Sequence, residues 1–64
     1  MIEVHIDGVR QIPGIDYVTG QNTIQFTTPP GFGLNICISD ARGTIANIWG
    51  DGHTNFWQLT LDLR

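Results

Sequence analysis

Apolar and polar side chains alternate along four stretches of this chain, at residues 2–7, 23–28, 34–39 and 56–63. Successive side chains of a strand point to opposite faces, so a period of two predicts a strand with one apolar face. Tyr17 and Val18 precede the 23–28 stretch, and the turn sequence 19–22 between them predicts a β-hairpin.

Shorter signals lie between these stretches. Asp7-Gly8 is a typical hairpin turn, after which residues 9–11 can form a short strand until Pro13-Gly14 interrupts the ladder. Gly14 and Gly20 stand at turn positions where a positive φ is expected.

Residues 44–49 fit two structures. Ile45 and Ile48 lie at helical spacing, whereas Thr, Ile and Trp favour strands. Six residues are few for a helix, so we expect a strand here.

These elements predict an all-β chain, a small antiparallel β-sandwich or open barrel of short strands, with residues 1–64 forming one domain. Composition agrees, because 19 of the 64 residues are Ile, Val or Thr, whose branched side chains favour strands. The predicted core comprises Ile2, Val4, Ile6, Tyr17, Ile24, Phe26, Leu34, Ile36 and Ile38.

Length limits the stability of such a domain. A chain of 64 residues buries a small share of its surface, and Cys37 is its only cysteine, so no internal disulfide can stabilise it. We therefore expect it to associate with copies of itself or with a larger assembly.

The charge of the chain and the absence of a targeting sequence limit the classes of partner that we expect. The net charge is −3, and the three Arg residues are scattered, which argues against a nucleic-acid partner. Glu3 and Asp7 stand where a signal peptide would be basic, and no apolar stretch is long enough to span a bilayer, so we expect no membrane partner. A lone Cys37 agrees with synthesis in a reducing cytoplasm.

Chemistry-bearing residues are few and scattered. His5, His53 and Asp51 could bind a metal, but Asp51 and His53 belong to a turn sequence and His5 to the polar face of a strand. Ser39-Asp40 with a His has the residue types of a hydrolase but no nucleophile elbow, and 31–33 lacks the helix of a phosphate loop. We expect no catalytic, metal or cofactor site.

Aromatic residues gather near the end of the chain. Tryptophan stacks on sugar rings and also anchors protein interfaces, so Trp49 and Trp57 allow a carbohydrate site, a core position or a subunit contact. Exposed, coplanar Trp side chains would favour the first, and buried ones the others. The predicted interface comprises Trp49, Phe56, Trp57, Leu59, Leu61 and Leu63.

An ordered set of residues resembles a known module. The set is Asp7-Gly8-Val9, Gln11, Pro13-Gly14, Asp16-Tyr17, Thr23-Ile24, Phe26 and Pro30. It is similar to the "DGV-x-Q-x-P-G-x-DY … TI-x-F" β-module that is repeated along tail fibres and related virion proteins of tailed bacteriophages. The segment 50–56 also resembles the "GDG-x-T-x-F" sequence that opens such a module.

Here the opening segment comes last, which departs from the pattern of the family. The final strand can fold back to complete its own module, as in a circular permutant, or insert beside the first strand of a neighbouring subunit. A third alternative is that it pairs elsewhere and the likeness is fortuitous. Because a small chain has little core of its own, we expect 56–63 to pair across a subunit boundary.

The resemblance implies a non-enzymatic structural component of a tailed-phage virion: a fibre, tail, neck or head-decorating protein made in the host cytoplasm. Its expected partners are copies of itself, preferably in a homotrimer, and other virion proteins. The alternative is a carbohydrate- or receptor-binding β-module that uses exposed Trp or Tyr side chains.

Overall fold

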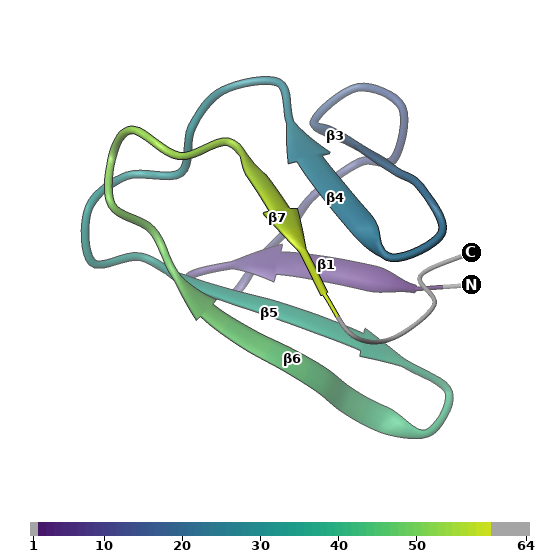
Figure 1. Cartoon of the computed structure of the whole chain (residues 1–64). Coiled ribbons are helices and arrows are strands. Elements are labelled where there is room, and N and C mark those ends of the chain that lie inside the picture. Colours follow the sequence, from purple (N-terminus) through teal and green to yellow (C-terminus); the bar gives the residue numbers. More distant parts are fainter. Residues whose placement is uncertain (1, 60–64) are drawn as a thin grey trace.

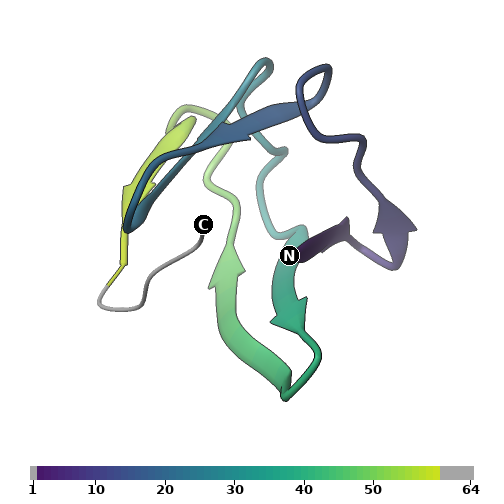
Figure 2. The same ribbon diagram turned by 90° about the vertical axis from the view of Figure 1, so that its right-hand side faces the viewer.

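The computed structural model describes residues 2–59, which form seven strands and no helix. The strands are β1 (Glu3–Ile6), β2 (Val9–Arg10), β3 (Tyr17–Thr19), β4 (Thr23–Phe26), β5 (Asn35–Asp40), β6 (Gly43–Trp49) and β7 (Phe56–Gln58). Sheet A has the order β2-β1-β5-β6 and sheet B the order β3-β4-β7, and all neighbouring strands are antiparallel. The two sheets form the layers of a small, open sandwich (Figures 1 and 2). The prediction of an all-β antiparallel fold is confirmed.

The core lies between the sheets and follows the alternation of the strands. Sheet A contributes cross-strand pairs such as Val4 with Ile38, and sheet B contributes Tyr17 with Phe26. Ile2 and Ile6 are partly buried against this core. The fully buried side chains are Val4, Tyr17, Ile24, Phe26, Ile36 and Ile38.

Leu34 is the exception among the predicted core residues. It lies one position before β5, is only partly buried and does not belong to the core cluster. A Cβ at Gly31 would lie 3.3 Å from Leu34 Cδ1, so the side chain packs on the loop before its strand. The strand alternation does not extend to this residue because β5 begins at Asn35.

The backbone angles at three turn positions can be compared with the predictions from local sequence. Asp7 and Gly8 have φ values of 51° and 85° between the paired residues Ile6 and Val9, as a two-residue hairpin turn of type I′ requires. Gly14 has φ 83°, as predicted. The same prediction is wrong for Gly20, which has no positive φ; a Cβ there would instead meet Thr23 Oγ1.

A β-bulge in β6 explains the ambiguous spacing at 44–49. Ile38 pairs with Ala46 but Ser39 pairs with Thr44, which leaves Ile45 as an extra residue in β6. Both Ile45 and Ala46 pack against the core, so the bulge lets Ile45 and Ile48 reach it despite their odd separation. The expected strand is present.

Two loops close one end of the sandwich through backbone hydrogen bonds. Gly33 N–H donates to Gly50 O at 2.9 Å, and Gly50 N–H donates to Leu34 O at 2.9 Å. Gly52 N–H donates to Pro30 O at 3.0 Å. A Cβ on Gly50 would collide with the carbonyl oxygen of Gly31, so this approach requires a residue without a side chain.

The last strand pairs within its own chain. β7 lies beside β4, with Ile24 opposite Trp57, and Leu59 N–H extends the pairing to Asn22 O at 2.6 Å. Residues 56–59 therefore pair within the chain through one edge of β7, the end strand of sheet B. The expected pairing of 56–63 across a subunit boundary stays a prediction, and 60–63 lie outside the described residues. The strand folds back because Trp57 and Leu59 find apolar contacts on this core.

Candidate interaction surface

The outer face of sheet B carries a row of uncharged side chains. Val18 pairs with Gln25, and Gln25 pairs with Phe56, so the three residues lie side by side across β3, β4 and β7. Val18 is 56% exposed and Phe56 is 50% exposed, at positions where alternation directs side chains away from the core. We call these three residues the sheet B row.

A shallow hollow lies at one end of the sheet B row. Its volume is about 190 Å³, and it is lined by Val18, Gln25, Phe26 and Thr27. Thr27 Oγ1 donates a hydrogen bond of 2.6 Å to the carbonyl oxygen of Ile15, which fixes the adjacent loop and leaves the Ile15 side chain 67% exposed. Apolar surface therefore continues from the hollow onto this loop.

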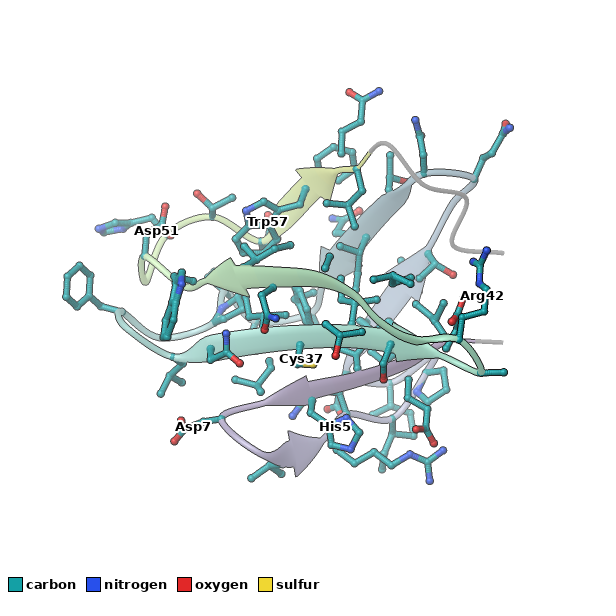
Figure 3. All side chains as sticks on the ribbon, turned by 90° about the horizontal axis from the view of Figure 1, so that it is seen from below. His5, Asp7, Cys37, Arg42, Asp51 and Trp57 are labelled. Carbon is teal, nitrogen blue, oxygen red and sulfur yellow. The ribbon has the colours of Figure 1, made fainter. Side chains whose placement is uncertain are left out.

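The strands of sheet B contain no charged residue. Among the described residues, the Asp, Glu, Arg and His side chains lie on sheet A or on the loops, as Figure 3 shows for His5, Asp7, Arg42 and Asp51. Interfaces between proteins are depleted of charged residues at their centre and enriched in aromatic ones. The sheet B row has both properties.

The predicted interface residues fall into separate groups. Phe56 belongs to the sheet B row, whereas the Trp57 ring contacts Phe26 edge to face at a centroid distance of 5.8 Å. Leu59 also packs against the core, and Trp49 is 66% exposed at the end of β6 on the other sheet. Leu61 and Leu63 lie outside the described residues. The two tryptophans therefore do not form one flat platform.

A second exposed aromatic residue lies at the closed end of the sandwich. Phe32 is 87% exposed, and its backbone nitrogen would lie 3.7 Å from a Cβ at Gly52. Trp49 precedes Gly50, whose carbonyl accepts from the residue after Phe32. Two exposed rings thus project from neighbouring backbone segments.

Asp51 organises the loop at this end. Its carboxylate accepts hydrogen bonds from the Thr54 hydroxyl, from Thr54 N–H at 2.6 Å and from His53 N–H at 2.8 Å. These bonds lower the pKa of Asp51 to about 2, with the Thr54 hydroxyl as the largest cause, followed by the backbone N–H groups of Thr54 and His53. The carboxylate is thus used to cap a turn.

The other candidate residues do not form a site. Among residues 2–59 no three His, Cys, Asp or Glu side chains are grouped to hold a metal ion. His5 lies opposite Cys37 on sheet A, far from Asp51 (Figure 3). Asp40 accepts a hydrogen bond from Arg42 at 2.8 Å across the β5–β6 turn, and this side-chain bond is the largest cause of its lowered pKa. Ser39 pairs with Glu3 and Thr44.

The interface predicted from the sequence did not include Val18 and Gln25. One feature of the sequence could have indicated this surface: residues 17–28 contain no charged side chain. The strand register that brings Phe56 beside them has no such signal in the sequence. That register pairs residues about thirty positions apart, so it requires the structure.

Comparison with known proteins gives no match to a family model, a curated protein or a solved structure. In residues 2–59 the structure has no helix with the length and hydropathy needed to cross a membrane.

Proposed function

We propose that the chain is a non-enzymatic structural component of a tailed-phage virion that acts by assembling with copies of itself and with other virion proteins. The observation that carries the proposal is the charge-free outer face of sheet B, with its exposed Phe56 and Val18. A surface that lacks charge and exposes an aromatic ring has the composition of the centre of a protein interface. Such a contact also meets the need of a short chain for additional burial.

The residues that resemble the phage module have roles in the fold. Asp7 and Gly8 adopt the positive φ values of a tight turn, and Gly14 does the same in the next loop. The Asp16 carboxylate accepts a hydrogen bond of 2.7 Å from Ile12 N–H, which closes that loop, and Tyr17 enters the core at 3% exposure. A motif built from turn and core residues fits a repeated structural module.

The proposal is tested on particles. Phage particles produced from a genome that encodes this chain should be purified by density gradient and their proteins quantified by mass spectrometry. We expect the chain in a fixed number of copies per particle, in the multiples that symmetric tail or head structures require. Its absence from intact particles, while it is abundant in the infected cell, would contradict the proposal.

A carbohydrate- or receptor-binding module is the alternative, and the exposed rings of Phe32 and Trp49 favour it. Aromatic faces stack on sugar rings. Tyr17 and Trp57 do not extend this surface, because both pack into the core. Glycan-array binding that disappears in the Trp49→Ala variant would support this alternative over the structural role.

A further inference from the structure

We infer that two copies of the chain associate through the outer face of sheet B, with Phe56 of each copy seated in the hollow beside Val18 of the other. The inference rests on the self-association that is part of the proposed function. It names the surface and the arrangement, which the proposed function leaves open.

Charge selects a second copy as the occupant of this face. The chain has a net charge of −3, so two copies repel each other wherever acidic side chains meet. Among the described residues, Glu3, Asp7 and Asp40 lie on sheet A or its turns, and Asp51 lies in the loop between β6 and β7. Asp16 lies in the loop before β3, where its carboxylate accepts a hydrogen bond from Ile12 N–H, and the strands of sheet B carry no charge. A face without charge lets an acidic chain meet itself without opposing like charges, whereas it offers no attraction to a strongly charged partner.

The order of the sheet B row suits a two-fold axis. Val18 and the hollow lie on one side of Gln25, and Phe56 lies on the other side. A two-fold axis that runs along β4 over Gln25 reverses the row of the second copy. Each Phe56 then faces the hollow beside Val18 of the other copy, and the contact is made twice.

Gln25 suits the position on the axis. A primary amide has both donor and acceptor atoms, so two Gln25 side chains can hydrogen-bond reciprocally. Packed sheets lie about 10 Å apart, which leaves room for two glutamine side chains to meet end to end. A charged residue at this position would oppose its own copy.

The area of the outer face of sheet B limits the expected affinity between two copies of the chain. The molecule measures 27 × 21 × 20 Å, so one face is small beside the roughly 800 Å² that each partner of a stable complex buries. We expect a dimer with a dissociation constant in the micromolar range. In an assembly that holds many copies together, the higher local concentration of the chain favours this contact.

The first experiment is sedimentation equilibrium on the full chain and on matched variants. We expect the average mass to rise from one chain to two with concentration. Val18→Glu and Phe56→Ala should each raise the dissociation constant at least tenfold, while Trp49→Glu, which adds the same charge at an exposed apolar residue of sheet A, should change it less than twofold. Circular dichroism and the unfolding midpoint show that each variant is folded, and Phe56→Leu serves if Phe56→Ala is not.

A second experiment tests the two-fold arrangement. In a Cys37→Ser background, Gln25→Cys should be joined to its copy by a bis-maleimide of about 10 Å, the distance between packed sheets. Thr44→Cys, on the other sheet, is the control and should remain uncoupled. Coupling at both positions or at Thr44→Cys alone would overturn the arrangement.

The outcomes separate this inference from the proposed function. A wild-type chain that stays monomeric at millimolar concentration, or a mass of three chains, overturns the two-fold contact. Association that responds equally to Val18→Glu and Trp49→Glu also overturns it. Each of these results is compatible with fixed copies of the chain in purified particles, whereas a dimer in solution with no chain in the particles contradicts the proposed function alone.

Discussion

Truncation of Phe26 to alanine should be the most damaging single change to the sandwich. The ring is 2% exposed and lies between two other aromatic rings, 6.2 Å from Tyr17 and 5.8 Å from Trp57 between centroids. It therefore connects all three strands of sheet B across one face. Removing a buried phenylalanine ring costs about 3 to 5 kcal/mol, because it combines lost burial with a cavity.

That loss is large relative to the whole domain. At about 0.05 to 0.15 kcal/mol per residue, a chain of 64 residues has a free energy of unfolding of roughly 3 to 10 kcal/mol. Since 1 kcal/mol shifts the unfolding midpoint of so small a domain by about 4 to 8 °C, Phe26→Ala should lower it by at least about 12 °C.

Urea unfolding followed by circular dichroism, at a chain concentration below that of association, measures the loss. Phe32→Ala is the matched control, because the same truncation at a ring that is 87% exposed should change the free energy of unfolding by less than about 0.5 kcal/mol. If Phe26→Ala is unfolded in water, Phe26→Leu should still fold with a smaller loss, about 1 to 1.5 kcal/mol. Equal midpoints for Phe26→Ala and the wild type would refute this description of the core.

Two further changes probe the loops. Gly14→Ala should lower the free energy of unfolding by about 1 to 2 kcal/mol in urea titrations, because φ 83° is unfavourable for a residue with a Cβ. Gly20→Ala should lose stability through the contact of its new Cβ with Thr23 Oγ1, so a Thr23→Ala background should relieve the loss at Gly20 and not at Gly14; equal relief at both positions would contradict the assignment. The folded-state pKa of Asp51 is depressed to about 2, so its stabilisation is present above the unfolded value of 3.8 and is lost as the pH falls towards 2. Asp51→Asn should lack this stabilisation at neutral pH and show a flatter thermal midpoint between about pH 4 and pH 2; identical pH profiles would show that the carboxylate does not hold the loop.

Strand alternation predicted the elements and most of the core because it is a local property. The hairpin of β3 and β4 and the Asp7-Gly8 turn have sequences that fix their own geometry. The prediction for Gly20 is wrong because a glycine in a turn need not have a positive φ; here the nearby Thr23 side chain leaves little space for a Cβ.

Partner choice among strands could not be predicted in the same way. β1 pairs with β5, and β4 pairs with β7, over about thirty residues of intervening chain. Such pairings depend on the burial of whole sheet faces, and no short sequence motif specifies which strands pair. Phe56 joins the sheet B row only through the β4–β7 pairing, whereas Val18 and Gln25 are neighbours in the local β3–β4 hairpin.

The extra residue at Ile45 has a consequence for protein engineering. It separates the tip of the β5–β6 hairpin, where the side chain of Arg42 is 77% exposed, from the part of β6 that packs on the core. A bulge absorbs a one-residue change in length without reversing the faces of the strand beyond it. Deletion of Ile45 should therefore restore an unbroken β5–β6 ladder while the apolar side chains of 46–49 keep their faces.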